Sequence, residues 1–304
     1  MELRQLRYFI AVVDAQGLRR AGAELRVAAS ALSRALDQLE QHLGVKLIDR
    51  SPGGIALTLA GQEFLPRARS IVDAADAAVH AMKQHSKGSA LRVGVVSGQL
   101  AAGELIILIL RGFRTRWPEL ALQANAISSV DQVGPLLAGT VDVAIVRVPI
   151  DHPGVEVIPL ALEPRALLVG ASTDLAAETE VDIEDVLHEP TIHLQGSPAW
   201  SHFWQLDTER GGENVNPALP PARNLDEMHA SVATGEVVIS TPPAVGRLAP
   251  TATTRCVALT GVTPSVIAIA RRRNDNRKIV QLFIDSAIAT TRAQIARLPG
   301  AIAT

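Results

Sequence analysis

Two neighbouring runs of helical periodicity near the N-terminus constrain this chain more than any other feature. The second run, residues 30–43, carries a leucine at every third or fourth position: Leu32, Leu36, Leu39 and Leu43. This spacing is typical of an amphipathic helix with one buried face, so the opposite face is left exposed. A shorter run precedes it at 18–25, and residues 50–58 follow with the turn formers Pro52, Gly53 and Gly54. Two helices and a two-stranded hairpin in this order predict a winged helix-turn-helix.

The exposed face of the 30–43 helix is the predicted DNA-reading surface, because the N-terminal part of the second helix of this motif meets base edges. Ser30 is expected to cap the start of the helix. The exposed stripe then carries Ser33, Arg34, Asp37 and Gln38. Arg34 is the leading base reader, since an arginine can donate two hydrogen bonds to a guanine edge, with Ser33 as its short-range partner. The alternative is that both are ordinary exposed helix residues.

Other side chains near this motif are candidates for the DNA backbone. Arg50, at the entrance to the wing, and Arg19 and Arg20, at the start of the 18–25 helix, are expected to bind phosphates, which set register without reading sequence. For Arg19 and Arg20 the alternative is a solvated charge. Thr58 either donates its hydroxyl to a phosphate or caps the following helix, and both interpretations stay open.

The rest of the chain divides by changes of periodicity. Residues 5–15 form a first amphipathic helix of the N-terminal domain. Residues 59 to about 87 are Ala-rich and predict a long helix with a narrow apolar seam suited to pairing with a second copy: Phe64, Ala68, Ile71, Ala75, Ala78 and Met82. After Gly88 short aliphatic strands alternate with helices at 91–96, 105–117, 120–127, 130–137 and 141–147. Such alternation favours a parallel α/β sheet.

Composition excludes several classes of protein. The chain has a formal net charge of -2, yet residues 1–70 hold ten Arg and Lys against seven Asp and Glu, so any positive footprint is confined to the N-terminus. One cysteine, Cys256, excludes an internal disulfide and a cysteine-based zinc finger and fits a reducing compartment. The longest aliphatic run, 105–110, is far shorter than the ~18 residues of a membrane span, and no signal-peptide pattern is visible. We therefore expect a cytoplasmic protein with no membrane partner.

Motifs of enzymes are also missing from the sequence. It contains no GxSxG, GxxxxGK[ST], HExxH or CxxC, and its eight histidines are scattered. We expect no catalytic activity, no cofactor and no metal.

Three stretches resemble the LysR-type transcriptional regulators: MELRQLRYFIAVV, AGAELRVAASALSRALDQLEQHLGVKLIDR and GIALTLAGQEFL. The resemblance covers about the first 65 residues closely and continues more weakly in LRVGVVSG, FRTRWPELAL and LLAGTVDVAIVR. It implies a multi-domain chain with an α-rich winged helix-turn-helix domain (1–58), a linker and dimerisation helix (59–88) and an α/β effector-binding domain (89–304). The effector domain would contain two Rossmann-like subdomains, about 91–160 with 266–304 and about 161–265, similar to type 2 periplasmic binding proteins.

The resemblance also implies partners and a mechanism. The partners would be double-stranded operator DNA with an interrupted inverted repeat, RNA polymerase, a small-molecule effector and further copies of the chain in a dimer of dimers. Effector binding would change the angle between the subdomains and so alter operator binding or promoter activation. Departures from the family pattern at Ala29, Ala35 and Asp37 indicate fewer direct contacts between this helix and the bases of the operator.

Open α/β sheets bind ligands beyond the carboxyl ends of their strands, which gives a set of effector candidates. Polar turns after strands contain Ser97, Gly98, Gln99, Ser128 and Ser129, Arg147 ends the strand of the VDVAIVR unit, and a similar polar turn in the other subdomain contains Gln195, Gly196 and Ser197. They offer hydrogen-bond donors and few acceptors, so a carboxylate-bearing metabolite, such as an organic or aromatic acid, is the expected ligand. The alternatives are that the serines only cap helices and that Arg147 pairs with a structural carboxylate.

A solute-binding protein is the competing interpretation of the whole chain, since residues 90–304 alone would fit one. Its DNA-reading face would then have decayed at Ala29, Ala35 and Asp37.

Overall fold

The computed structural model describes residues 1–51, 54–85, 90–97 and 101–304. The chain forms two compact units, Met1–Lys83 and Gln84–Thr304. Each unit is considered by itself.

Three helices build the core of the first unit: α1 (Leu3–Asp14), α2 (Leu18–Leu25) and α3 (Ala29–Leu43). The apolar stripe of α3 is buried at Leu32, Leu36 and Leu39, as the leucine spacing predicts. The helix begins one residue earlier than expected. Ala28 is its N-cap, in extended conformation and without a side-chain cap, so the prediction that Ser30 caps this helix is wrong. Ser30 lies inside the first turn and is exposed.

The wing follows as β1 (Ile48–Ser51) paired antiparallel with β2 (Gly54–Leu57). Glu40 of α3 holds its base, because its buried carboxylate accepts hydrogen bonds from the backbone N–H of Leu47 (2.8 Å) and Ile48 (3.1 Å) and from Lys46 Nζ (2.6 Å). Burial alone would raise the pKa of Glu40, but these hydrogen bonds outweigh it and lower that pKa below its usual value. The carboxylate therefore holds the start of β1 against the end of α3.

The long helix α4 runs from Leu59 to His85 and contains Pro66. Gly61 in its first turn has no room for a side chain, since a Cβ there would lie 2.0 Å from the Leu47 carbonyl oxygen. This close approach explains the glycine of the LTLAG sequence.

The expected seam of α4 is partly used inside its own unit. Phe64 and Ala68 pack into the core with Phe9, whose ring centroid lies 5.7 Å from that of Phe64. Of the seam residues expected to meet a second copy, Ile71 is 41% exposed, and the side chains of Ala78 and Met82 lie outside the described part of the chain. Placing Ala68 in an intermolecular seam is therefore wrong, because it is fully buried in its own unit, whereas the assignment of the half-buried Phe64 stays a prediction.

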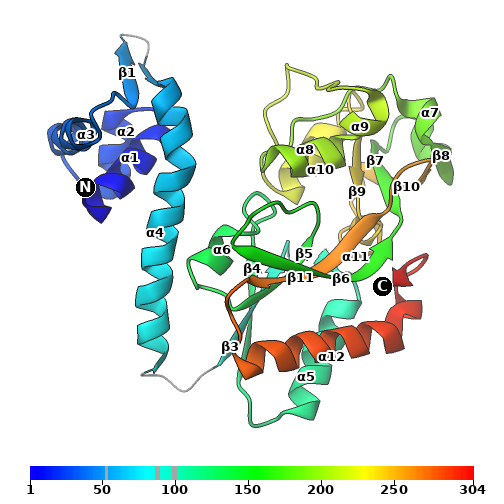
Figure 1. Cartoon of the computed structure of the whole chain (residues 1–304). Helices are drawn as coiled ribbons and strands as arrows, with labels where there is room; N and C mark the ends of the chain where they lie inside the picture. The colour runs from blue at the N-terminus through cyan, green and yellow to red at the C-terminus, as the bar shows by residue number, and fades with distance from the viewer. Residues whose placement is uncertain (52–53, 86–89, 98–100) are drawn as a thin grey trace. The chain divides into compact units, whose positions relative to one another are not determined.

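The second unit contains two sheets (Figure 1). The larger has the strand order β12-β6-β11-β5-β3-β4. Its strands are β3 (Leu91–Val96), β4 (Leu122–Ile127), β5 (Val143–Arg147), β6 (Val155–Glu163), β11 (Ser265–Arg272) and β12 (Ile302–Ala303). The smaller has the order β8-β10-β7-β9. Its strands are β7 (Arg165–Gly170), β8 (Glu180–Asp182), β9 (Ile239–Thr241) and β10 (Thr254–Thr260).

The expectation of a parallel sheet, made on residues 91–147, is confirmed, because β3 runs parallel to β4 and β5. Strand β11, which lies outside that stretch, runs antiparallel to both β5 and β6. The antiparallel strands connect the two sheets: β6 leads into β7 through Pro164, and β10 leads into β11 through residues 261–264. The chain thus passes twice between two α/β subdomains.

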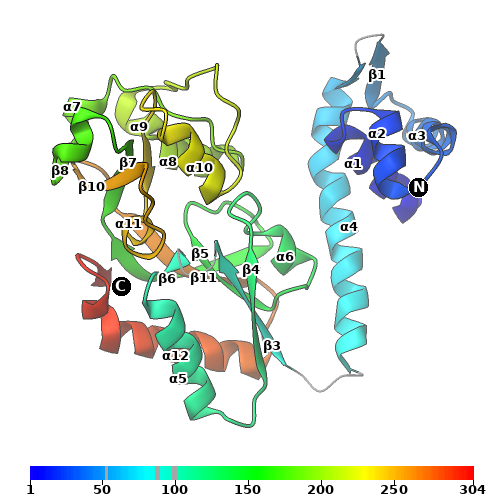
Figure 2. The ribbon, with the colours of Figure 1, turned by 180° about the vertical axis from the view of Figure 1, so that it is seen from behind.

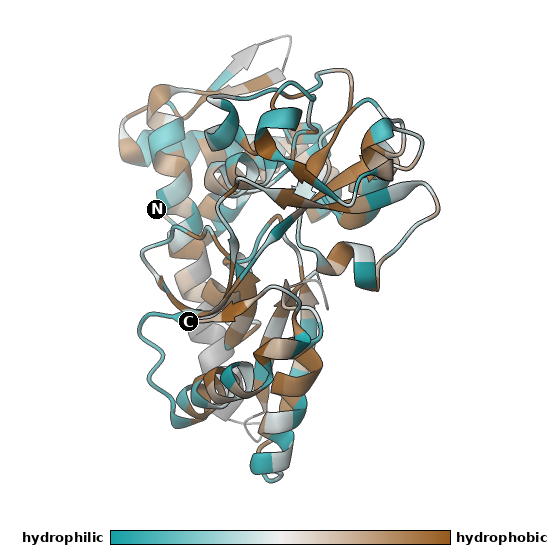
Figure 3. Ribbon diagram, turned by 90° about the vertical axis from the view of Figure 1, so that its right-hand side faces the viewer, coloured by the Kyte–Doolittle hydropathy of each residue, from teal (hydrophilic) through white to brown (hydrophobic). Residues whose placement is uncertain are grey.

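Helices cover the sheets (Figures 1 and 2). They are α5 (Leu105–Arg116), α6 (Gly134–Leu137), α7 (Ile183–Val186), α8 (Pro198–Gln205), α9 (Asp207–Arg210), α10 (Leu225–Val232), α11 (Ala244–Leu248) and α12 (Lys278–Gln294), with short 3-10 turns at Asp174–Ala177 and Ile295–Arg297. Helices α5 and α12 pack against each other through Phe113 and Phe283, whose ring centroids lie 5.4 Å apart. Figure 3 shows hydrophobic residues on the strands and along the helices. Among the described residues, no helix is both long and apolar enough to span a bilayer.

Helix α6 is shorter than the helix expected at 130–137. Asp131 accepts hydrogen bonds from the backbone N–H of Val133 and Gly134, at 3.3 and 2.7 Å, and so holds the preceding residues in a turn. Gly134 begins the helix and Pro135 follows in its first turn, where the missing N–H of proline costs nothing.

Candidate DNA-contacting face and effector pocket

The outward face of α3 presents most of the DNA-contacting candidates together. Ser30, Arg34, Asp37 and Gln38 are exposed, and Ser33 is half-buried. Gln38 also accepts a 3.4 Å hydrogen bond from Gln5 Nε2, so α1 holds this amide in position. Arg34 and Ser33 lie in the first two turns of the helix, the part that would meet base edges in a major groove.

The phosphate candidates lie at the edges of this face. Arg19 and Arg20 are exposed in the first turn of α2, which begins after Gly17. Arg50 lies in β1, opposite Ile55 of β2. The hydroxyl of Thr58 donates to the Lys46 carbonyl oxygen at 2.6 Å and accepts from the Gly61 N–H at 3.0 Å. The capping interpretation of Thr58 is therefore the one that the structure supports, because a bond to phosphate would require Thr58 to release Lys46.

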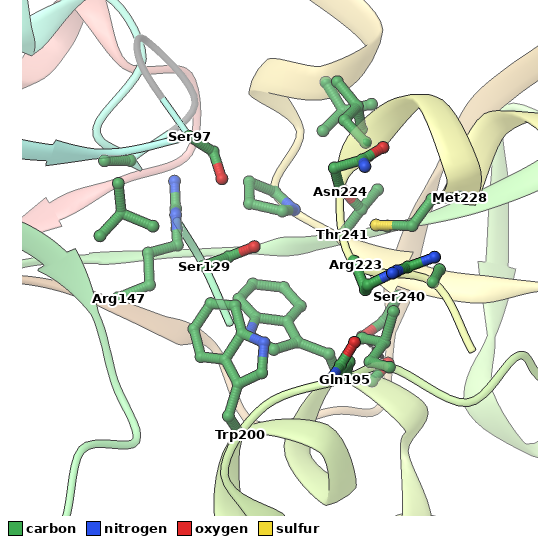
Figure 4. A pocket seen from close by; sticks show the side chains of 18 residues that line it. Ser97, Ser129, Arg147, Gln195, Trp200, Arg223, Asn224, Met228, Ser240 and Thr241 are labelled. Carbon is green, nitrogen blue, oxygen red and sulfur yellow. Dashed lines mark hydrogen bonds between the residues drawn. The ribbon is translucent and has the colours of Figure 1, made fainter. Parts of the chain in front are cut away.

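A pocket lies between the two subdomains of the second unit, with about 630 Å³ of empty space that is partly open to solvent. One wall carries Ser97, Ser129 and Arg147, and the other carries Gln195, Thr241 and Asn224 (Figure 4). The indole rings of Trp200 and Trp204 supply a broad apolar surface.

Of the nine effector candidates, four line this pocket: Ser97, Ser129, Arg147 and Gln195. Ser97 stands at the end of β3 with φ +49°, a left-handed conformation that costs a serine free energy, and its N–H is fixed by the Ile127 carbonyl at 3.0 Å. Strain held in this way is common at ligand sites, and it brings the hydroxyl of Ser97 to the pocket.

The other candidates are placed differently. Ser128 turns its hydroxyl to the Val130 N–H (3.1 Å) and is absent from the pocket lining. Ser197 caps α8 by accepting from the Trp200 N–H at 3.3 Å, which is the capping alternative. Gly196 also lies outside the lining, and a Cβ on it would stand 2.9 Å from Trp200 Cδ1. These two residues therefore position Trp200. Gly98 and Gln99 lie outside the described residues.

Arg147 has the structural carboxylate partner that the alternative interpretation foresaw. Its guanidinium is paired with Glu163 at the end of β6 and donates to the Ser265 hydroxyl at 2.8 Å. Both members of the pair are buried, at 2% and 0% exposure. Burial lowers the pKa of Arg147, and the charge of Glu163 opposes this shift. Glu163 and Ser265 stand at the two passages between the subdomains, so this pair connects the pocket wall to both of them.

Most residues of the second wall of the pocket were not predicted from the sequence. Trp200, Trp204, Arg223, Asn224, Met228 and Thr241 all line the pocket. Within the described part of the chain, Thr241 Oγ1 and Trp204 Nε1 are buried without a hydrogen-bond partner. Buried polar atoms of this kind are costly unless something pairs with them. The one local signal was Asn224, which precedes the helical run of α10 and caps it by accepting from the Glu227 N–H at 2.9 Å.

Family models match both units. Residues 3–62 match the bacterial regulatory helix-turn-helix protein, lysR family, and residues 84–292 match the LysR substrate binding domain. The chain belongs to the LysR family. This agrees with the motif resemblance of its first 65 residues and with the predicted fold class, an α-rich winged helix-turn-helix, a linker helix and an α/β domain of two subdomains.

The family relationship extends to named regulators. The chain is 36% identical over 172 residues to the HTH-type transcriptional regulator TcbR of Pseudomonas sp. strain P51, covering 57% of this chain and 58% of TcbR. It is 34% identical to ShiR of Corynebacterium glutamicum strain R, covering 69% and 73%. The matches to TcbR, to YnfL of Escherichia coli and to AlsR of Bacillus subtilis span 58–66% of those relatives' length.

Solved structures of the family share the fold. CbnR, a LysR family transcriptional regulator, is 25% identical with a TM-score of 0.56, covering 95% of this chain and 99% of CbnR. CbnR complexed with its target DNA is 26% identical with a TM-score of 0.52, at the same coverage.

Proposed function

We propose that this LysR-family protein is a DNA-binding transcriptional regulator whose operator binding or promoter activation is controlled by a small carboxylate-bearing effector. The observation that carries the proposal is the presence of two sites on one chain. A helix-turn-helix unit exposes Arg34 on α3, and a second unit holds a pocket with two unpaired buried polar atoms.

The DNA site is proposed on the exposed face of α3. Arg34 would donate to a guanine edge, with Ser33 and Gln38 beside it, while Arg19, Arg20 and Arg50 would bind phosphates. The complex of CbnR with its target DNA supports this use of the motif. Two copies related by a two-fold axis would read an inverted repeat, so we also propose a homo-oligomer, a dimer of dimers, that contacts RNA polymerase.

The effector site is proposed in the pocket of the second unit. Donors from Ser97, Ser129 and Thr241 surround it, and the Trp200 and Trp204 rings can pack against a flat ligand. Arg147 attracts a carboxylate, but Glu163 already neutralises part of its charge. Binding would therefore rest on the neutral donors and the apolar wall as well as on the arginine.

Footprinting on DNA from upstream of the protein's own gene tests the DNA-binding half. The full-length protein, Arg34→Ala and the control Arg67→Ala are compared at one stated salt concentration, since phosphate contacts make the affinity salt-dependent. Arg67 is exposed on α4 and only pairs with Glu63 of the same helix, at 2.8 Å. We expect a symmetric protected site that Arg67→Ala keeps and Arg34→Ala loses. Equal protection by Arg34→Ala would refute the role of Arg34.

A thermal-shift screen of small organic and aromatic acids tests the effector half on the same full-length protein. An acid that stabilises the protein should also change the footprint or the reporter response. Stabilisation by acids with no protected DNA site under any condition would favour a solute-binding protein.

A further inference from the structure

Three side chains with metal-ligating atoms meet beside the pocket wall, at a place that the proposed function does not use. They are His202 of α8, Asp207 of α9 and Glu213, which follows the end of α9. One ligand atom from each lies within 4.8 Å of the others. Helices α8 and α9 adjoin in both views of the chain (Figures 1 and 2).

Asp207 is the unusual member of this group. It is only 7% exposed, and in the described structure neither of its buried carboxylate oxygens has a hydrogen-bond partner of good geometry, although the amide of Gln205, whose Nε2 is also buried and unpaired, lies close enough to lower the pKa of Asp207. Burial raises the pKa of Asp207, and the charge of Glu213 adds to that rise, while His202, Arg210 and the nearby Gln205 amide oppose it. A buried carboxylate without a partner is costly unless it is protonated or paired with a cation, and a bound metal ion is one such cation.

The two neighbouring arginines are engaged elsewhere in part. Arg210 donates its terminal N–H groups to the backbone carbonyls of Glu189 and Val186, at 2.5 and 3.5 Å. Arg165 is paired with Glu209 and donates to the Phe203 carbonyl. The Nε of Arg210 is buried and without a partner in the described structure, so Arg210 is the side chain that could compete with a metal ion for Asp207.

One of the distances within the group is compatible with a shared metal ion. His202 Nε2 and Glu213 Oε1 lie 3.3 Å apart. Two ligand atoms bound to one tetrahedral zinc ion, each about 2.1 Å from it, are about 3.4 Å apart. Glu213 is exposed and follows Gly211 and Gly212, whose φ values are +72° and +154°, so its backbone has an uncommon freedom to adjust.

We propose that His202, Asp207 and Glu213 form a binding site for a divalent transition-metal ion, with zinc as the best fit. One imidazole nitrogen and two carboxylate oxygens are ligands that zinc accepts, whereas calcium and magnesium favour oxygen alone. Two carboxylates also neutralise the charge of one divalent ion when the imidazole is neutral. Three protein ligands leave a position for water.

The site has a structural consequence for the pocket. Helix α8 carries His202 and, on the same short helix, the pocket residues Trp200 and Trp204. A metal ion would tie this helix to the segment after α9. We therefore expect zinc to change tryptophan fluorescence, since two of the three tryptophans of the chain are on α8.

Calorimetric titration of chelator-treated full-length protein with Zn²⁺ tests the proposal directly. The variants are His202→Gln and Glu213→Gln, both at exposed positions. The matched control is His188→Gln, because His188 Nε2 also lies 3.3 Å from a carboxylate, that of Glu189, but outside the group of three. We expect one Zn²⁺ per chain in the parent and the control, and at least about tenfold weaker binding in the two variants.

A second measurement separates the metal from Arg210. Asp207→Asn removes a buried charge, so we expect the metal-free variant to be at least as thermally stable as the parent and to gain no stability from Zn²⁺. Co²⁺ added to the parent should give the visible absorption of a site of low coordination number, absent from His202→Gln. Equal Zn²⁺ affinity in all variants, or no stoichiometric binding by the parent, would overturn the site. A metal-free Asp207→Asn protein that is markedly less stable would assign Asp207 to Arg210 instead.

Discussion

The DNA-contacting face and the effector pocket are built in opposite ways. The face belongs to one helix, and its candidates lie within nine residues of each other, from Ser30 to Gln38. The pocket takes its lining from segments between Val96 and Val245, on two subdomains. A continuous site can be recognised from periodicity, because one helix sets its geometry. A site assembled from distant segments depends on how the chain returns to it.

The largest expected effect is on the free energy of unfolding, and it tests whether the pocket residue Arg147 also depends on its buried partner Glu163 for stability. Replacing Glu163 with alanine leaves Arg147 buried without its carboxylate, which should cost about 3–5 kcal/mol of unfolding free energy. Urea unfolding followed by tryptophan fluorescence reports this, since Trp117, Trp200 and Trp204 all lie in the second unit.

The control for that experiment is the apolar double variant Arg147→Met with Glu163→Leu. Removing both charges together should cost far less than removing one, because no unpaired ion remains. A single variant as stable as the parent would show that Arg147 does not depend on Glu163.

The next effect concerns α3, the helix that carries the DNA-contacting face. Glu40→Ala removes the acceptor of two buried N–H groups and should destabilise the start of the wing by about 2–3 kcal/mol. Because the pKa of Glu40 is lowered on folding, its contribution is complete above the ordinary glutamate value of about 4.3 and is lost as the pH falls through the lowered value.

Hydrogen exchange of the Leu47 and Ile48 amides at neutral pH measures this effect. Both amides should exchange faster in Glu40→Ala, and amides of the second unit should not change. Unaltered protection of Leu47 and Ile48 would mean that Glu40 does not hold the wing.

A smaller effect separates two adjacent serines. Ser129 lines the pocket and Ser128 does not, so Ser129→Ala should weaken the response to an effector by about two- to tenfold, the value of one hydrogen bond. Ser128→Ala is the matched control and should keep the parent's dose response in a promoter reporter. The same shift in both variants would place the effector elsewhere.

The smallest effect is on operator affinity, and it concerns Asp37, the departure from the family pattern on the exposed face of α3. A carboxylate near phosphates weakens binding, so Asp37→Asn should tighten operator binding by a few-fold and less at high salt. Affinities at two salt concentrations measure it. Weaker binding by Asp37→Asn would instead indicate that Asp37 accepts a hydrogen bond from a cytosine amino group.

Local patterns predicted the first unit well because its helices bury their own apolar stripes. Leu32, Leu36 and Leu39 had to face inward, and Arg34 had to face outward. The start of α3 was misplaced by one residue because Ser30 is a favoured capping type, yet Ala28 takes the extended conformation of the cap. Ala68 fitted a pairing seam equally well until its burial in the core of its own unit was known.

The pocket of the second unit was predicted mainly at the ends of its early strands. Ser97 and Ser129 follow strands and Arg147 ends one, and the rule for open sheets places such residues at the pocket. Trp200, Arg223 and Thr241 gave no such signal, because they reach the pocket from the other subdomain. The antiparallel course of β11 was also missed, since strand direction leaves no mark on a short aliphatic run.

The sequence by itself determined the recognition helix, the wing and the family, since their spacing is local and each helix or turn carries its own periodicity. Only the tertiary structure decided that Arg147 is paired with Glu163 and that Ser129 lines the pocket while Ser128 does not. It also decided that Asp207 is buried beside His202 and Glu213. The physical reason is that burial and pairing are properties of contacts between distant segments. No single stretch of the chain contains both partners of such a contact.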